Sequence, residues 1–283
     1  MEIKKIVVVG SGQMGIGIAQ VCLMPGFSVT AIDVQAAALE RVVKQIGSSL
    51  GRSVEKGKLS ETDRDNMLTR LNTSSDFATA ADADFVIEAV NEDIDLKMQV
   101  FAQLDKIVKS EAIFASNTSA LSITTMATAT ARRDRFVGMH FFLPVQVMRL
   151  VEIIRGQETS EETINVVRDL ALKQGKEPVV AKDYPGFLST RLGMPYMNEA
   201  FYAVYEGRGS VEDIDKCAKL GLNHPLGPLE LADFIGLDTV LSILENLYQN
   251  FGESKYFPCP QLRNLVNAGY LGRKSGRGFY NYA

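Results

Sequence analysis

The stretch Ile6-Val7-Val8-Val9-Gly10-Ser11-Gly12-Gln13-Met14-Gly15-Ile16-Gly17 decides the fold expected for this chain. It joins a short apolar run, typical of a buried strand, to three glycines spaced GxGxxG and to the start of a helical pattern. The first glycine permits a tight turn, the second lets the backbone approach a pyrophosphate, and the third lets the helix pack closely on the strand. We therefore predict a Rossmann-type dinucleotide-binding unit. The residues expected to contact the dinucleotide here are Gly10, Gly12, Gln13, Met14 and Gly15.

An acidic residue follows the second predicted strand. Ser28–Ile32 reads as that strand, and Asp33 comes directly after it, about 20 residues beyond the middle glycine. A carboxylate at this point can accept hydrogen bonds from both ribose hydroxyls and would repel a 2′-phosphate. The sequence thus favours NAD over NADP, although a glycine-rich turn and an Asp that merely ends a strand would look the same.

Composition sets the broad class of the protein. The chain has 283 residues, 46% hydrophobic and 23% charged, with a net charge of −4. These values are typical of a globular protein and give no sequence-wide attraction to nucleic acid or to an anionic membrane. The three cysteines are far apart and no Cys/His cluster suggests a metal, which fits reduced thiols. Residues 1–9 offer an apolar run too short for a signal peptide or a membrane span, so we expect a cytoplasmic protein.

The pattern of the chain changes near residue 185. Before it, apolar runs alternate with stretches of helical spacing, which predicts a parallel sheet covered by helices. The apolar runs are Ile6–Val9, Phe85–Ile87, Ile113–Ala115 and Phe136–Met139. After it, helical patterns follow one another over Phe187–Glu206, Val211–Leu220 and Leu229–Phe251. We predict an α/β NAD-binding domain over residues 1–184 and a mostly α-helical domain for substrate and dimerisation over residues 185–283.

The chain has two histidines, and one of them lies where ligands of this fold bind. His140 follows an apolar run and falls at the C-terminal edge of a predicted strand, and its near-neutral intrinsic pKa suits proton exchange. Glu152 stands in an otherwise apolar strand, where an unpaired carboxylate would be costly. His140 is a suitable partner for it, although a satisfied buried histidine is an equal alternative for His140 alone. His224, in a Pro-rich turn, reads as structural.

Several segments together resemble the L-3-hydroxyacyl-CoA dehydrogenases, and most closely their short bacterial members, the 3-hydroxybutyryl-CoA dehydrogenases. The resemblance covers essentially the whole chain. The segments that carry it are 10–15, 115–119, 138–142, 147–152, 183–187, 224–228 and 271–276. It implies reversible hydride transfer between NAD(H) and a 3-hydroxyacyl-CoA/3-ketoacyl-CoA pair, in an assembly that is at least a homodimer.

The resemblance also implies roles for individual residues. His140 corresponds to the general acid/base, and Glu152 to the carboxylate that orients it. Ser119 corresponds to a serine that hydrogen-bonds the substrate oxygen, while Ser116 and Asn117 lie beside the cofactor. Read without the family, the polar cluster at 116–119 is a helix N-cap, and the two interpretations are compatible.

Four charged residues are assigned with the help of the same resemblance. Arg52 and Lys56, four apart in a predicted helix, would present both cations on one face and bind the phosphates of CoA. A solvated charged helix is the alternative. Glu92 and Lys97 match positions close to the cofactor or active site, with ordinary surface placement as their alternative.

Two positions depart from the family pattern. Leu143 stands after His140-Phe141-Phe142 where the family usually has Asn, and Leu has no hydrogen-bonding group. Thr190 precedes Arg191 where the family usually has an Asn that polarises the substrate carbonyl; its hydroxyl can still donate, with a shorter reach. The departures leave two rival hypotheses: a relative acting on a free hydroxy acid, such as a gulonate-type 3-dehydrogenase, and an NAD-binding protein with weakened catalysis.

Overall fold

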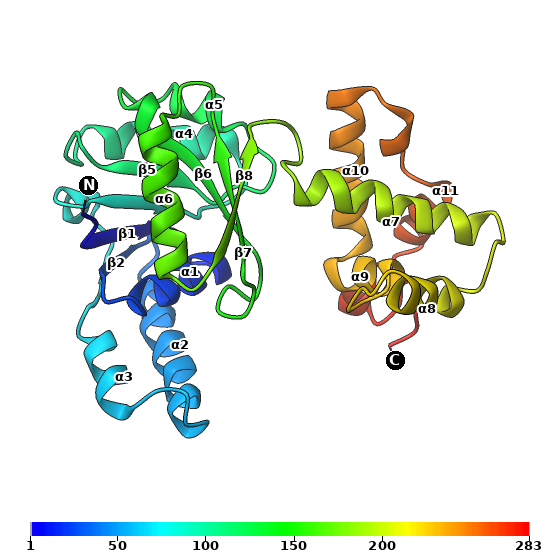
Figure 1. The fold of residues 1–283 in the computed structure, drawn as a ribbon, viewed down its shortest axis with the longest axis horizontal. Coiled ribbons are helices and arrows are strands. Elements are labelled where there is room, and N and C mark those ends of the chain that lie inside the picture. Colours follow the sequence, from blue (N-terminus) through cyan, green and yellow to red (C-terminus); the bar gives the residue numbers. More distant parts are fainter. Residues whose placement is uncertain (1, 283) are drawn as a thin grey trace. The chain divides into compact units, whose positions relative to one another are not determined.

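The computed structural model describes residues 2–282, and the chain forms two compact units, Met1–Phe187 and Leu188–Ala283. The first unit is built on a sheet with strand order β3-β2-β1-β4-β5-β6-β7-β8. Its strands are β1 Lys5–Val9, β2 Ser28–Ile32, β3 Leu71–Ser74, β4 Phe85–Glu88, β5 Ile113–Ser116, β6 Phe136–Phe141, β7 Leu150–Arg155 and β8 Glu177–Lys182 (Figure 1). The order reverses at β1 and β4, which places ligands at the carboxyl ends of these strands.

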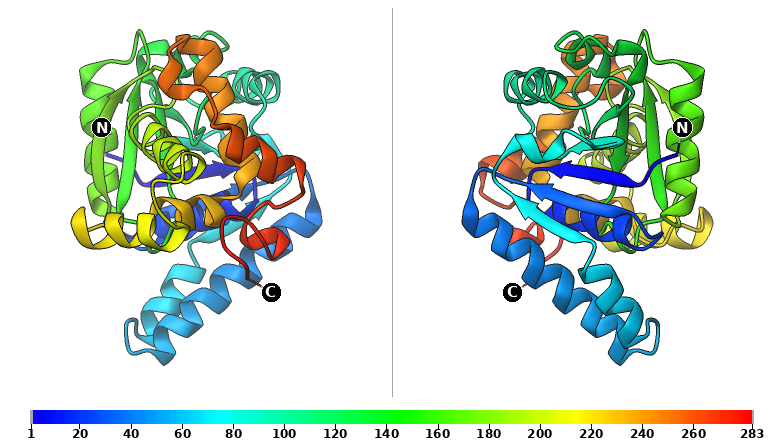
Figure 2. Two further views of the ribbon diagram at one scale, coloured as in Figure 1. Left: turned by 90° about the vertical axis from the view of Figure 1, so that its right-hand side faces the viewer. Right: turned by 90° about the vertical axis from the view of Figure 1, so that its left-hand side faces the viewer.

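Helices cover both faces of this sheet. They are α1 Gln13–Leu23, α2 Ala36–Glu55, α3 Glu61–Leu68, α4 Ile94–Asp105, α5 Ile123–Ala127 and α6 Glu161–Lys173, with the short turns η1 Phe77–Ala80 and η2 Arg133–Arg135. Alternate residues of β1 enter the two cores, Ile6 and Val8 on one face and Val7 and Val9 on the other. Helices α2 and α3 form a hairpin beside the sheet (Figure 2). The predicted Rossmann-type α/β fold is confirmed.

The predicted parallel sheet has one antiparallel pair. β6 and β7 pair antiparallel, whereas the other neighbouring strands of the described sheet are parallel. The physical reason is the short connection of residues 142–149, since a parallel neighbour needs a crossover of a dozen or more residues.

The second unit is helical, as predicted. Its elements are α7 Ser189–Tyr205, α8 Val211–Gly221, α9 Pro228–Ile235, α10 Leu237–Phe251, η3 Ser254–Tyr256, α11 Pro260–Asn267 and η4 Arg273–Ser275. The single helix expected over 229–251 is two helices, because Gly236 adopts a φ of 104° that ends α9. Likewise, α7 begins two residues after Phe187, which has a φ of 45°. None of the helices within residues 2–282 is both long and apolar enough to span a bilayer.

Candidate active site

The glycine loop joins β1 to α1 in the conformation that its sequence requires. Gly10 has a φ of 98°, and a Cβ added there would lie 2.5 Å from the carbonyl oxygen of Ala89. A Cβ on Gly15 would lie 1.8 Å from the carbonyl oxygen of Gly10, so the start of α1 packs directly on the loop. By contrast, a Cβ on Gly12 would have no atom within 4 Å. Gly12 therefore borders open space, where a ligand can approach the backbone.

Residues around this loop fit a dinucleotide. They line a cavity of about 390 Å³ that also includes Asp33, Gln13 and Met14. No side chain caps the N-terminus of α1, which leaves its first N–H groups for an anion. The Ser11 hydroxyl is buried without a hydrogen-bond partner among the described residues. Asp33 accepts hydrogen bonds from the backbone N–H groups of Ser11 at 2.7 Å and Gln35 at 2.9 Å, so its carboxylate is held in the cavity.

His140 and Glu152 form a buried pair across the antiparallel strands β6 and β7. They are direct register partners, and His140 Nδ1 lies 2.8 Å from Glu152 Oε2. Glu152 is fully buried, and the imidazole packs against the rings of Phe142 and Phe187. A carboxylate bonded to Nδ1 holds the proton on that nitrogen and leaves Nε2 for exchange with a ligand.

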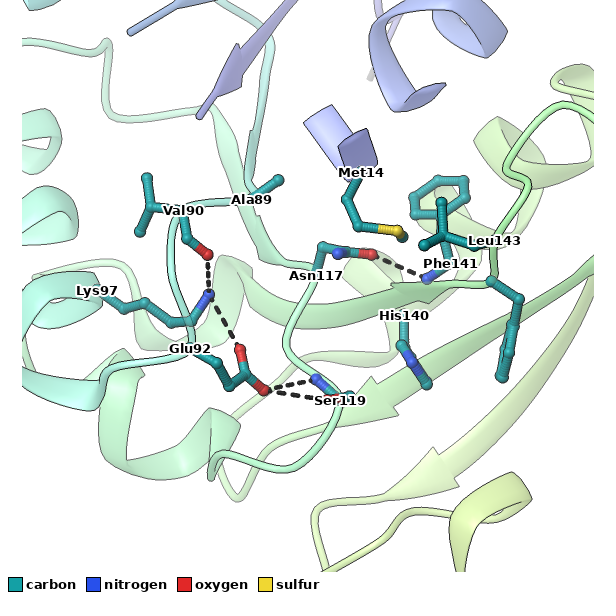
Figure 3. Close-up of a pocket in the computed structure, with 11 residues that line it drawn as sticks. Met14, Ala89, Val90, Glu92, Lys97, Asn117, Ser119, His140, Phe141 and Leu143 are labelled. Atoms are coloured by element: carbon teal, nitrogen blue, oxygen red, sulfur yellow. Dashed lines mark hydrogen bonds and ion pairs between the residues drawn. The ribbon is translucent and has the colours of Figure 1, made fainter. Parts of the chain in front are cut away.

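His140 borders a second cavity of about 390 Å³ (Figure 3). Its lining includes the predicted residues Glu92, Lys97, Asn117, Ser119 and His140. Met14, Ala89, Val90 and Leu143 also line the dinucleotide cavity described above. The two cavities are thus neighbours, and His140 lines the second of them.

A charge network centred on the buried pair Lys97 and Glu88 lies at the wall of this cavity. Lys97 Nζ donates to Glu88 Oε1 at 2.6 Å and to the carbonyl of Val90 at 3.2 Å, and lies 3.3 Å from Glu92 Oε2. Burial raises the pKa of Glu88 even though Lys97 opposes that shift. Burial also acts against the charged form of Glu92, but the Thr118 hydroxyl and Lys97 outweigh it and lower the pKa of Glu92.

The network positions the polar residues at the end of β5 and just after it. Ser116 Oγ donates to Glu88 Oε2 at 2.6 Å. The backbone N–H and hydroxyl of Ser119 donate to Glu92 Oε1 at 2.9 and 3.2 Å. Asn117 instead turns to β6, and its Oδ1 accepts from the backbone N–H of Phe141 at 3.0 Å. Lys97 is buried, so ordinary surface placement is excluded for it, whereas the Glu92 side chain is 40% exposed at the border of the cavity. Glu88, which sequence reasoning missed, is fully buried and joins them.

A groove of about 690 Å³ runs along α2. Arg52 lines it, but Lys56 does not: α2 ends at Glu55, so Lys56 follows the last helical turn. Sequence reasoning missed Arg41 and Lys44, which line the same groove. Cations at positions 41, 44 and 52 have the spacing that places side chains on one side of a helix. This pattern could have been recognised in the sequence.

Leu143, Thr190 and His224, which the sequence singled out, lie in different parts of the structure. Leu143 is 42% exposed and borders the groove and both cavities. Thr190 belongs to the second unit, in the first turn of α7. His224 also lies in the second unit, where its ring packs edge-on against Tyr196 at 5.1 Å.

Comparison with known proteins agrees with this arrangement. Residues 5–184 match the NAD-binding domain of 3-hydroxyacyl-CoA dehydrogenase, and residues 186–282 match the C-terminal domain of the same enzyme. The chain belongs to the 3-hydroxyacyl-CoA dehydrogenase family. This confirms the resemblance identified in the sequence.

Relatives within the 3-hydroxyacyl-CoA dehydrogenase family match over the whole chain. A "Probable 3-hydroxybutyryl-CoA dehydrogenase" of Bacillus subtilis is 52% identical over 100% of this chain and 98% of its own. A 3-hydroxybutyryl-CoA dehydrogenase of Bradyrhizobium diazoefficiens is 47% identical over 99% and 96%. The crystal structure of an (S)-3-hydroxybutyryl-CoA dehydrogenase from Ralstonia eutropha superposes with a TM-score of 0.97, at 48% identity and 100% coverage of both chains.

Proposed function

We propose that this protein is an NAD-dependent dehydrogenase that interconverts 3-hydroxyacyl-CoA and 3-ketoacyl-CoA, with (S)-3-hydroxybutyryl-CoA and acetoacetyl-CoA as the short-chain pair. The observation that carries the proposal is the His140–Glu152 pair at 2.8 Å, which borders a cavity next to the dinucleotide loop. Membership of the 3-hydroxyacyl-CoA dehydrogenase family and the named relatives support the same substrate class.

Proton exchange falls to His140. With Nδ1 engaged by Glu152, Nε2 is the nitrogen that takes the hydroxyl proton during oxidation and returns it during reduction. The buried carboxylate stabilises the imidazolium that forms, and it holds the ring in one orientation. Glu152 therefore acts through His140 and not on the substrate.

Ser119 and Thr190 are proposed as the contacts to the reacting oxygen. While the Ser119 hydroxyl donates to Glu92, its oxygen can accept the hydrogen of a substrate alcohol. With a ketone bound, the same hydroxyl can turn and donate to the carbonyl. Thr190 would add a second donor from the helical unit. Losing one such donor typically costs about 10²–10³ in turnover.

NAD would be held by Gly10, Gly12, Gln13, Met14, Gly15 and Asp33, with Glu92, Lys97, Ser116 and Asn117 beside its reactive end. When bound, it supplies the acceptor for the hydride of the alcohol. The exposed backbone at Gly12 and the uncapped N–H groups of α1 would bind its phosphates, and the Asp33 carboxylate would accept hydrogen bonds from the ribose hydroxyls.

The CoA end of the substrate is assigned to the groove along α2. Arg41, Lys44 and Arg52 line it, and the charge of the guanidinium and ammonium groups suits the phosphates of CoA. Lys56, at the end of the helix, would add a further cation near Arg52. The groove favours this substrate over a free hydroxy acid, which needs no phosphate site.

The assembly and location of the protein complete the proposal. Residues 1–184 would bind NAD, while residues 185–283 would complete the substrate site and form a homodimer. We expect the dimer to cover exposed apolar side chains of the helical unit, such as Leu192 and Leu220, which are 73% and 76% exposed. Three free cysteines suit the reducing cytoplasm. Light scattering coupled to size-exclusion chromatography tests the dimer.

The function is tested by the oxidation of NADH, and in parallel of NADPH, with acetoacetyl-CoA. We expect turnover with NADH and a clear preference for it over NADPH. His140→Ala abolishes turnover, and the matched control His224→Ala, in the helical unit, leaves it nearly unchanged. Binding of NADH without turnover of acetoacetyl-CoA would instead favour the weakened protein that Leu143 suggests.

The variant Arg52→Ala distinguishes the proposed activity on acyl-CoA from the gulonate-type alternative, which acts on a free hydroxy acid. The variant is expected to raise KM for acetoacetyl-CoA, because Arg52 lines the groove assigned to the CoA phosphates. The assignment to acyl-CoA is contradicted if the parent enzyme oxidises a free hydroxy acid and the Arg52→Ala variant has the same kinetic constants as the parent.

A further inference from the structure

The loop of residues 142–149 connects the two strands that carry the catalytic pair. It leaves β6 just after His140 and enters β7 just before Glu152. Gln146 and Val147, at its tip, line the groove along α2. Most of the loop is exposed, so its position depends on a few contacts.

One of these contacts is made by a buried lysine. Lys176, just before β8, is 5% exposed. Its Nζ donates to the carbonyl of Val145 and, at 2.8 Å, to the carbonyl of Met148. No described carboxylate forms an ion pair with it, and burial lowers the pKa of this lysine. Burying a cation costs free energy unless its N–H donors have acceptors. The two carbonyls supply these acceptors and offset the cost of burying the Lys176 ammonium.

Two further contacts hold the same loop against α1. The Val145 side chain is buried against α1, where a Cβ on Gly17 would lie 2.7 Å from the Val145 Cβ. Gln146 Nε2 donates to Gln20 Oε1 at 2.9 Å, and Gln20 Nε2 donates in turn to Ser49 Oγ at 3.0 Å. The loop is thereby tied to both helices that line the groove.

The carbonyls that Lys176 binds flank Gln146 and Val147. We infer that Lys176 is a positioning residue for acyl-CoA: it fixes the 145–148 turn so that this turn forms the groove wall facing Arg52. The inference rests on the proposed function, because it assigns this groove to the CoA part of the substrate. Lys176 itself touches neither the reacting atoms nor the dinucleotide cavity.

The test compares Lys176→Met with Lys173→Met, an exposed lysine at the end of α6. Methionine keeps the length of the side chain but has no donor. We expect KM for acetoacetyl-CoA to rise about tenfold in Lys176→Met. The reason is that losing the hydrogen bonds of a charged group changes an equilibrium constant by about tenfold or more. kcat and the Kd for NADH should stay within about threefold of the parent. Lys173→Met should change none of these values.

A truncated substrate locates the effect. The acetoacetyl thioester of N-acetylcysteamine lacks the nucleotide of CoA, so Lys176→Met should leave its kcat/KM unchanged. Lys176→Arg, which keeps the charge and the donors, should recover most of the loss with acetoacetyl-CoA. An unchanged KM in Lys176→Met, or an equal loss with both substrates, overturns the inference, as does a Lys176→Arg variant no better than Lys176→Met.

Hydrogen exchange separates this inference from the proposed function. The amides of Val147 and Met148 both donate to the carbonyl of Pro144, so their protection reports the order of the turn. They should exchange faster in Lys176→Met than in the parent or in Lys173→Met. If the parent fails to turn over acetoacetyl-CoA, the proposed function fails. Equal protection in Lys176→Met and the parent refutes the positioning of the loop in either case.

Discussion

Lys97→Met tests the buried charge network directly. The side chains of Lys97 and Glu88 are 1% and 0% exposed, and their charged atoms lie 2.6 Å apart. Methionine fills similar space but leaves the Glu88 carboxylate buried with no cation. Breaking a buried ion pair in this way costs about 3–5 kcal/mol of unfolding free energy. For a unit of this size that is a fall in Tm of about 6–20 °C, measured by thermal unfolding.

The sign of the pH dependence follows from the two carboxylates. The pKa of Glu88 is already above its ordinary value because of burial, and it rises further without Lys97. The penalty is therefore full above the raised pKa and disappears as the pH falls to the ordinary value of 4.5. Glu92 acts in the same direction, since its lowered pKa stabilises the fold only at higher pH. The loss of Tm should be larger at about pH 8 than at about pH 5.

Two variants control this experiment. Lys106→Met removes an exposed ammonium just after α4 and should change the stability by less than about 0.5 kcal/mol. The double variant Glu88→Gln/Lys97→Met removes both charges and should recover most of the lost Tm. A Lys97→Met protein that unfolds within about 1 °C of the parent refutes the reasoning. So does a double variant as unstable as the single one.

Three further predictions concern the cofactor and the catalytic pair. Glu152→Gln should lower kcat with acetoacetyl-CoA about 10–100-fold at nearly unchanged Tm, because a neutral amide replaces the carboxylate at His140 Nδ1; a kcat within twofold of the parent contradicts its role. Gly12→Ala should fold normally and bind NADH weakly, whereas Gly15→Ala should lower Tm, because only a Cβ at position 15 would meet backbone atoms. Equal Tm values for the two variants would contradict this prediction. Asp33→Ala should raise the Kd for NADH about tenfold and narrow the preference over NADPH, and titration with both cofactors checks this.

The dinucleotide unit could be predicted because its signals are local. Val9, the three glycines and the strand before Asp33 each report a conformation through residues next to them in the chain. The break at Gly236 was missed because an isolated glycine in a helical pattern is usually tolerated, and only the observed φ of 104° shows the helix ending there.

The polar site was less predictable, because its members are brought together by tertiary contacts. Glu88 follows an apolar run as though it merely ended a strand, yet it receives hydrogen bonds from Ser116 and Lys97 on two other elements. Arg41 and Lys44 went unassigned because a charged helix face usually points to solvent. Only the groove shows that these cations share a concave surface with Arg52.

The catalytic pair depends on strand register, which the sequence could not supply. His140 and Glu152 are opposite each other in the antiparallel pairing, so a slip of one residue would turn Glu152 to the other face of the sheet. β7 is also fixed on its far side by β8, where Glu152 is paired with Val179. The dyad is thus held by the sheet, while the groove wall is held by the loop that Lys176 binds. Because these supports are separate, Glu152→Gln should act on kcat and Lys176→Met on KM.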